Sequence, residues 1–268
     1  MHTLTPGDAL NMGLRYGSFA KLKVENMQEQ HEEIMMNASV EKEVKEEKPR
    51  QKYAIITVAA GDGLKDMFKE LRADYVISGG QTMNPSTEDF VEAIHQLNAE
   101  HIIILPNNSN IVMAAQQAAL VCEDQNIEVI PTKSIPQGLS ACIMFNPDVD
   151  FETNLSEMKE AVSMVKTGQV TYAIKDTTFE GMEIKSGDYM GILEKDIIVS
   201  LQDKMETTRQ LLDRMLDDES EIVTLIYGED INEEEAEEVA AYIEDKFDVE
   251  VEVNNGMQPV YSFIIGVE

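Results

Sequence analysis

The sequence contains no tryptophan, and aromatic residues make up only 6% of its 268 positions. Because 43% of the residues are hydrophobic, a sizeable core is still predicted, built mainly from aliphatic and methionine side chains. Cysteine is also scarce. Cys122 and Cys142 each lie in an apolar stretch outside any Cys-x-x-Cys motif, which predicts buried thiols in a reducing compartment and argues against a disulfide framework.

Basic residues are few as well, with 21 Lys and Arg against 51 Asp and Glu, for a net charge of -30. Such a charge repels nucleic acid and anionic membrane surfaces, so neither is expected as a partner. It favours either well-solvated helix faces or a partner with a basic surface. No apolar run is long enough to span a membrane, and no signal peptide is recognisable, so we expect a cytoplasmic location.

The first fifty residues divide into two parts. Residues 1–30 predict a short helix followed by a strand, a piece too small to bury its own core, which we interpret as the remnant of a middle domain. Residues 31–51 are dominated by charge and lack glycine, so we expect a charged linker.

The segment 52–148 alternates short apolar strands with amphipathic helices. We expect strands near 53–60, 74–80, 101–108 and 127–133, each followed by a helix, the last of them at 136–145 with Gly138 inside it. Strands that are apolar throughout are typical of a sheet covered on both faces. The predicted fold class is therefore α/β, with a parallel sheet between two helical layers.

The segment 149–268 predicts a second, α+β lobe. We expect a helix over 150–168 that ends at Gly168, then a β-meander with a turn at 186–188. A helix over 202–216, a strand over 221–228 and an acidic helix over 231–247 follow, before two closing strands. Asn232 is predicted to cap the acidic helix together with Glu235, and its glutamate run is most simply a solvated face.

Two loops could carry chemistry because both follow apolar strands. In open α/β sheets ligands bind beyond the carboxyl ends of the strands. The first loop runs from the end of a strand to a helix capped by Ser86 and Asp89, and the second follows Leu105. Their neutral donors suit a carboxylate or a phosphate, although a tight, well-capped turn explains the first loop equally well. The binding candidates are Ser78, Gly79, Gly80, Gln81, Thr82, Asn84, Ser86, Asn107 and Asn108.

Other motifs are weaker. Gly61-Asp62-Gly63 follows the first strand of this region and could approach a phosphate, but it is not a complete phosphate-binding loop and a simple turn is favoured. No histidine lies at metal-ligand spacing from a cysteine or another histidine. We find no arrangement of residues that predicts a nucleophile with its base, so no catalytic residue is proposed.

Several stretches resemble the YloV-like family, the kinase component of fatty acid kinase, which is related to dihydroxyacetone kinases. They are VISGGQTMNPSTEDFVEAI, HIIILPNNSNIVMAAQQAA, VAAGDGLKDMFKEL and the ending GMQPVYSFIIGVE. The opening HTLTPGDALNMGLRYGSFAKLKVENMQEQH is similar to the end of that family's middle domain. The resemblance implies that 52–268 forms a two-lobed, DegV-like architecture.

The resemblance also implies a function. In the family, a separate nucleotide-binding domain holds Mg-ATP, and this chain has no counterpart of it, so we expect no cofactor and no kinase activity here. The family phosphorylates a fatty acid presented by a DegV-type acyl-binding protein, and the product feeds phospholipid synthesis. His2 could match one ligand of a structural zinc in some members, but the other ligands are missing.

Three functions remain open at this point. The first is a partner-binding region that docks the acyl-binding protein for a kinase domain of the same family, with a homodimer also possible. The second is a domain that itself binds a fatty acid or a phosphorylated metabolite. The third, a free-standing enzyme, has the least support. A long apolar tunnel beside the predicted cleft would favour the second, and a filled interior the first.

Overall fold

The computed structural model describes residues 50–80, 84–122 and 125–268. Arg50–Glu268 forms one compact unit. The predictions for residues 1–49, namely the middle-domain remnant, most of the charged linker and the role of His2, lie outside the described residues. Within the described part of the chain, no helix is long and apolar enough to cross a membrane.

A four-stranded parallel sheet forms the first lobe, in the order β2-β1-β3-β4. Its strands are β1 (Gln51–Ala59), β2 (Tyr75–Ser78), β3 (Ala99–Leu105) and β4 (Asn126–Val129). The helices of this lobe are α3 (Asp62–Glu70), α4 (Thr87–His95), α5 (Val112–Val121), α6 (Ile135–Met144) and α7 (Phe151–Met164). The parallel sheet predicted from the alternating pattern is confirmed.

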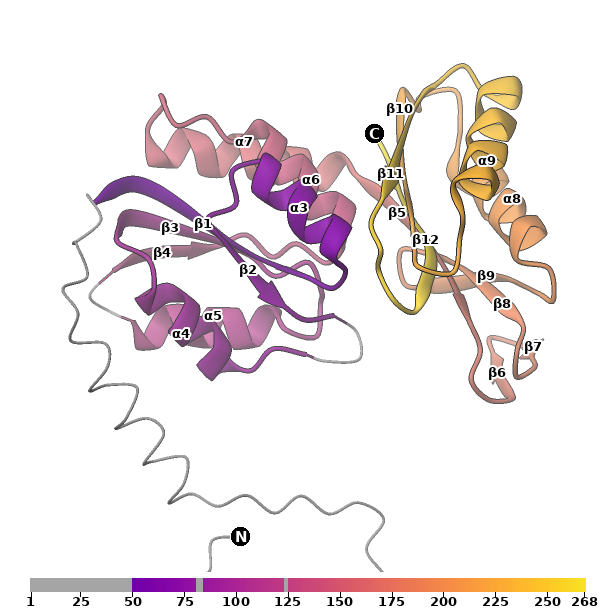
Figure 1. Cartoon of the computed structure of the whole chain (residues 1–268), viewed down its shortest axis with the longest axis horizontal. Helices are drawn as coiled ribbons and strands as arrows, with labels where there is room; N and C mark the ends of the chain where they lie inside the picture. Colours follow the sequence, from indigo (N-terminus) through magenta and orange to yellow (C-terminus); the bar gives the residue numbers. More distant parts are fainter. Residues whose placement is uncertain (1–49, 81–83, 123–124) are drawn as a thin grey trace, which may run out of the picture. The chain divides into compact units, whose positions relative to one another are not determined.

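Helices cover both faces of this sheet, with α4 and α5 on one side and α3, α6 and α7 on the other (Figure 1). Consecutive side chains of a strand point to opposite faces. On β1, Ile55 therefore joins the core under α3 and α6, while Ile56 joins the core under α4 and α5. On β3, Ile103 and Ile104 divide in the same way. Two buried faces explain why these strands are apolar without alternation.

Local capping sets several helix starts. The Ser86 side chain accepts from the Asp89 N–H, and the Asp89 carboxylate accepts from the Ser86 N–H, which completes the predicted capping box of α4. Asn232 and Glu235 form the same arrangement at the start of α9 (Glu233–Lys246), also as predicted. Each cap satisfies backbone donors that the first helical turn leaves unpaired.

The second lobe contains a mixed six-stranded sheet in the order β11-β10-β12-β5-β8-β9. Its strands are β5 (Lys166–Tyr172), β8 (Tyr189–Leu193), β9 (Asp196–Leu201), β10 (Ile222–Tyr227), β11 (Glu250–Asn255) and β12 (Tyr261–Val267). A separate hairpin consists of β6 (Thr177–Phe179) and β7 (Met182–Ile184), and α8 spans Lys204–Met215. The predicted meander corresponds to β5 through β9.

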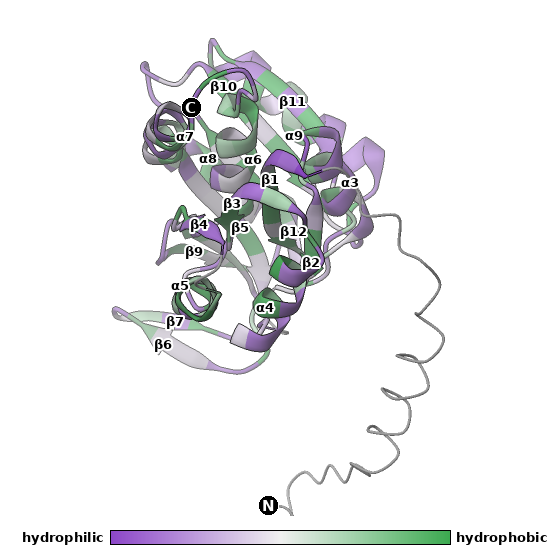
Figure 2. Cartoon of the chain, turned by 90° about the vertical axis from the view of Figure 1, so that its left-hand side faces the viewer, coloured by the Kyte–Doolittle hydropathy of each residue, from purple (hydrophilic) through white to green (hydrophobic). Residues whose placement is uncertain are grey.

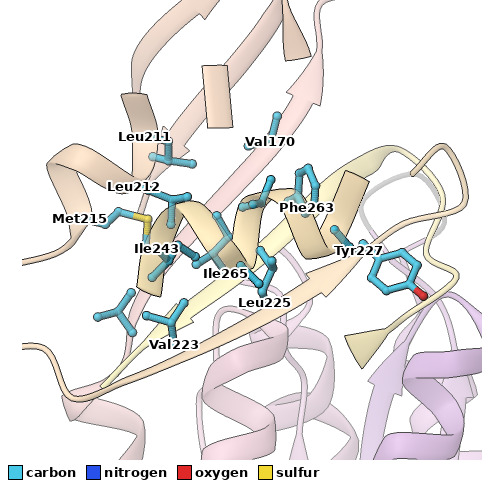
Figure 3. Packing of buried hydrophobic residues seen from close by; sticks show 14 of the residues in the cluster. Val170, Leu211, Leu212, Met215, Val223, Leu225, Tyr227, Ile243, Phe263 and Ile265 are labelled. Atoms are coloured by element: carbon cyan, nitrogen blue, oxygen red, sulfur yellow. The ribbon is translucent and has the colours of Figure 1, made fainter. Parts of the chain in front are cut away.

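Helices α8 and α9 pack on one face of this sheet. Figure 3 shows Leu211 and Leu212 from α8 and Ile243 from α9 meeting the strand residues Leu225 and Ile265. All of these side chains are buried, and together they form the main core of the second lobe. The predicted α+β lobe is present, but its expected first helix, α7, packs with α6 in the first lobe, so the second lobe begins at β5 and not at residue 149.

Gly168 corrects one prediction. Helix α7 ends at Met164, and Gly168 lies inside β5 instead of terminating the helix. A Cβ at this position would come within 2.2 Å of the Met215 Sδ atom on α8. The glycine therefore allows α8 to approach the strand closely, which a reading of helix-stop signals alone cannot detect.

The opposite face of the second sheet meets the first lobe. Ile226 on β10 and Ile264 on β12 belong to the same hydrophobic cluster as Ile103 and Leu105 on β3. A Cβ on Gly266 would lie 2.7 Å from Pro136 in α6, so the two lobes approach closely there. The two sheets thus share a continuous core, and the candidate cleft lies at its edge.

Candidate functional site

The cleft lies beyond the carboxyl ends of β1, β2 and β3, where ligands bind in open α/β sheets. The first lobe lines it with Val58, Ala60, Leu64, Gly79, Gly80, Pro106, Asn107, Asn108 and Ile135. The second lobe contributes Gln169, Gln258, Pro259, Val260, Tyr261 and Ile264. Four of the nine predicted binding candidates therefore line one cleft, together with residues that the sequence did not single out.

Asn107 is one of the buried lining residues of the cleft, and its side chain is fully hydrogen-bonded. Its Nδ2 donates to Thr57 Oγ1 at 2.7 Å and to the Val58 carbonyl at 3.0 Å. Its Oδ1 accepts from Thr132 Oγ1 at 2.8 Å. A Cβ on Gly138 would lie 2.1 Å from this Oδ1, so the glycine inside α6 makes room for the amide. Asn107 therefore holds three chain segments together and has no free donor to offer a ligand.

Asn108 joins the two predicted loops. Its Nδ2 donates to Asn84 Oδ1 at 3.2 Å, and its Oδ1 accepts from the Asn110 N–H at 2.9 Å. Asn108 is buried, whereas Asn84 is exposed. β1 separates β2 from β3 in the sheet, yet the loops that follow β2 and β3 meet.

The remaining candidates have different positions. Ser78 is the exposed last residue of β2, while Gly79 and Gly80 border the cleft. Ser86 is committed to the cap, and hydrogen bonds from the Ser86 N–H and hydroxyl lower the pKa of Asp89 below its usual value. Gln81 and Thr82 lie outside the described residues. Whether any of these residues binds a ligand or a partner stays a prediction.

The second lobe brings two polar side chains that sequence reasoning missed. Gln258 is buried, and its Nε2 donates to the carbonyls of Ile226 and Tyr261 at 3.2 and 3.3 Å. Its Oε1 has no hydrogen-bond partner among the residues that the structure describes. Burial raises the pKa of Tyr261 to about 12, so its phenol stays protonated above the pH at which an exposed tyrosine ionises. Both residues lie in the ending GMQPVYSFIIGVE, which carried part of the family resemblance but was not considered as a binding segment.

Three residues that border or adjoin the cleft have positive φ angles. They are Asn107 at 58°, Met257 at 50° and Val260 at 76°. Asparagine adopts this conformation readily, but a β-branched valine does so rarely. The Val260 carbonyl accepts from Thr171 Oγ1 at 2.7 Å, which helps to hold the strained loop. Strained backbone of this kind is concentrated at functional sites.

The Gly61-Asp62-Gly63 motif forms part of the contact between the two lobes. The Leu64 N–H, in the first turn of α3, donates to the Gly256 carbonyl at 3.0 Å. A Cβ on Gly63 would lie 2.0 Å from the Asn255 carbonyl oxygen. The second lobe therefore occupies the helix start that could otherwise have faced a phosphate.

The free space in the cleft is small and neutral. Its volume is about 60 Å³, and no lining residue in the described part of the chain carries a charge. Sites for small organic ligands usually measure roughly 300–1,000 Å³. The cleft thus has room for a few water molecules or a small group, and it has no cation to pair with a carboxylate. No cluster of His, Cys, Asp and Glu among the described residues could hold a metal.

Solved structures of DegV proteins share this arrangement of lobes. A DegV lipid binding protein from Thermotoga maritima matches with a TM-score of 0.59 and 12% identity, over 81% of this chain and 98% of that chain. A DegV family protein from Thermus thermophilus, whose fatty acid binding is reported, matches with a TM-score of 0.54 and 13% identity over 81% of this chain and all of that chain. The predicted DegV-like fold is confirmed.

Comparison of sequences identifies the family. The model for the C-terminal domain of FakA-like proteins, a fatty acid kinase family, matches residues 54–268, and the model for the FakA-like middle domain matches residues 1–34. The chain therefore belongs to the FakA-like fatty acid kinase family, as the motifs predicted.

Two curated relatives align with the whole chain. Protein YloV of Bacillus subtilis (strain 168) is 47% identical over 269 residues, and protein SAR1202 of Staphylococcus aureus (strain MRSA252) is 45% identical over 272 residues. The alignments cover all of this chain and 48% of each relative. The chain thus spans about half the length of the curated relatives it matches.

Proposed function

We propose that this chain is the non-catalytic, partner-binding region of a fatty-acid-kinase-like protein. In this proposal it docks a DegV-type acyl-binding protein, so that a separate kinase domain of the same family can phosphorylate the fatty acid in the cytoplasm. The observation that carries the proposal is the cleft itself, which has the position of a ligand site but too little space for an acyl chain.

Side chains fill the interior next to the cleft, between the two sheets. Ile103, Leu105, Ile226 and Ile264 are buried in one continuous cluster between the two sheets. A long acyl chain would have to displace part of this core, and close-packed protein interiors resist such displacement. The filled interior supports the docking function over storage of a fatty acid.

The second candidate function is binding of a small ligand. The Oε1 of buried Gln258, unpaired among the described residues, favours it, because an unsatisfied buried acceptor is costly and a ligand could supply a donor. The DegV proteins reported to bind lipid or fatty acid offer a further reason to consider it. A neutral cleft of this size would take a small hydrogen-bond donor and not a carboxylate or phosphate.

Calorimetry with two titrants separates these functions. The chain is titrated with a DegV-type acyl-binding protein loaded with fatty acid, and separately with the fatty acid alone. The Thermus thermophilus DegV protein is the positive control for the second titration. We expect saturable binding of the loaded protein and none of the free fatty acid. Stoichiometric fatty acid binding would support the second function, and absence of both would contradict the docking proposal.

The loop after β2 is the proposed contact surface. Thr82→Ala should weaken binding of the loaded acyl-binding protein without changing the melting temperature, since Thr82 has no predicted capping duty. Thr178→Ala, in the exposed β6 strand, is the matched control and should leave binding unchanged. Equal binding by both variants would remove the loop from the proposed surface.

A further inference from the structure

The outer face of α5 is uncharged and apolar in an otherwise acidic chain. From Ile102 to Cys122 the sequence contains no acidic or basic residue, although charged residues make up 27% of the whole chain. Met113, Leu120 and Val121 on this helix are 79%, 69% and 59% exposed. Three large apolar side chains therefore lie on the surface of one helix, with no charge among them.

The buried side of the same helix is separate from this face. Ala115 and Ala118 pack in the core beneath α4 and α5, so the exposed side chains are not needed to hold α5 in place. Figure 2 shows α5 in the green of hydrophobic residues. Large apolar side chains that gather on an exposed surface mark interaction sites more often than isolated ones do.

Carboxylates on α4 border this apolar face. Helix α4 packs against α5, and the Cys122 Sγ atom at the end of α5 lies 3.9 Å from His95 Nε2 at the end of α4. Glu92 and Glu88 share the helical stripe of His95, because residues three or four positions apart are neighbours on a helix. Both glutamates are exposed. The apolar face therefore has a row of negative charge along its α4 side, and Glu92 lies at the end nearer Leu120.

We propose that the acyl-binding protein docks on this α4–α5 surface, which consists of Met113, Leu120 and Val121 on α5 and of Glu88 and Glu92 on α4. The inference rests on the proposed function and adds the place of contact and the chemistry of the partner. The partner presents apolar side chains to α5 and lysine or arginine side chains to α4. An apolar centre with a polar rim is the usual composition of a protein interface.

The sign of the charge selects this occupant. The carboxylates of α4 repel an anionic membrane, and they equally repel an acidic protein, a second copy of this chain included. A partner with a basic rim is attracted to the same carboxylates while its apolar centre covers α5. The net charge of -30 on the whole chain adds long-range attraction for the same kind of partner.

The α4–α5 surface also adjoins residues already considered as binding candidates. Helix α4 begins at the Ser86 cap, shortly after Asn84. The Asn108 side chain, which donates to Asn84 at 3.2 Å, lies shortly before the start of α5. A partner that covers both helices therefore reaches the mouth of the cleft without leaving the first lobe.

Reversing the charge at Glu92 tests the sign of the partner's rim. Calorimetry titrates the full 268-residue chain with the fatty-acid-loaded acyl-binding protein, in low and in high salt. Salt should weaken binding, because it screens opposite charges. Glu92→Lys should weaken binding at low salt and reduce this salt dependence. Glu160→Lys is the matched control, since Glu160 is also exposed and lies on α7, across the first sheet from α4 and α5 (Figure 1).

Leu120→Gln tests the apolar centre, because glutamine removes apolar surface without adding a charge and is well tolerated in a helix. The variant should raise the dissociation constant about tenfold, the change expected when one leucine side chain is no longer buried by the partner. Met164→Gln on α7 is the matched control, since Met164 has the same 69% exposure as Leu120. It should leave the dissociation constant unchanged.

Thermal melts establish that all four variants fold, which their exposed positions predict. Tighter binding by Glu92→Lys, unchanged binding by Leu120→Gln, or equal losses in the two α7 controls would overturn the α4–α5 surface and leave the docking function in place. A wild-type chain that does not bind the loaded protein would overturn the docking function and the surface together. Binding of zwitterionic lipid vesicles that Leu120→Gln abolishes, with protein binding intact, would assign the face to a membrane instead.

Discussion

The Leu64 N–H donates to the Gly256 carbonyl at 3.0 Å, so the second lobe caps a helix of the first. Gly63 makes this contact possible, because a Cβ there would lie 2.0 Å from the Asn255 carbonyl oxygen. The cleft borders this junction, with Leu64 and Gln258 both in its wall. Its shape therefore depends on how closely the two lobes approach.

Gly63→Ala should destabilise the protein by about 1–3 kcal/mol, the usual cost of overpacking a tight contact. Urea unfolding measures the change. Gly181→Ala is the control, because nothing lies within 4 Å of a Cβ at Gly181 and only its positive φ opposes the substitution. If Gly63→Ala lowers the free energy of unfolding by no more than Gly181→Ala does, the lobes do not pack against Gly63 closely enough to exclude a Cβ.

Asn107→Ala should destabilise the protein by at least about 2 kcal/mol, because it leaves buried polar groups on Thr57, Val58 and Thr132 without their partner. Asn84→Ala should cost much less, since Asn84 is exposed and its carbonyl accepts one hydrogen bond, from Asn108. Chemical denaturation of both variants provides the comparison. Similar losses for the two would show that Asn107 is not the main structural link at the cleft.

Ser86→Ala should lower the free energy of unfolding by about 1 kcal/mol, the typical value of a helix N-cap. The loss arises because the Asp89 N–H loses its side-chain acceptor. Ser86→Asn offers a control that retains a capping acceptor and should recover most of the stability. A thermal melt in which Ser86→Ala matches the wild type would mean that the cap contributes nothing.

Tyr261 should make the protein less stable at alkaline pH. An unfolded tyrosine ionises near pH 10, but the folded pKa is about 12, so between these values the unfolded state loses its proton first. Stability contributed by the neutral phenol is therefore complete below pH 10 and decreases as the pH rises toward 12. At pH 11 the loss should be on the order of 1 kcal/mol.

Tyr261→Phe tests this by removing the ionisable group. The variant should lose less stability than the wild type when urea unfolding is compared at about pH 9 and about pH 11, on either side of the unfolded pKa. The difference between the two proteins isolates Tyr261 from the other groups that titrate in the same range. Parallel losses in both would contradict the raised pKa.

The chain alone should not bind Mg-ATP. Its sequence contains no complete phosphate-binding loop, and the first turn of α3, which could have faced a phosphate, donates to Gly256. Isothermal titration with Mg-ATP should give no saturable heat. Micromolar binding would contradict the proposed non-catalytic function.

The sequence predicted the features that depend on neighbouring residues. The Ser86–Asp89 and Asn232–Glu235 capping boxes were identifiable because each joins groups three positions apart. The parallel sheet was identifiable because strands buried on both faces must be apolar throughout. The prediction that Gly168 ends a helix was wrong because its role does not depend on neighbouring residues. It depends on Met215, which lies far along the chain.

The sequence by itself thus determined the order of strands and helices, the two lobes and the two loops at one sheet edge. Only the tertiary structure decided that the side-chain amide of Asn107 is engaged in hydrogen bonds with Thr57 and Thr132. It also decided that Gln258 and Tyr261 complete the cleft, and how little space remains there. Secondary structure follows from local periodicity, whereas a cleft is the space left over when distant side chains pack, and no local pattern encodes that volume.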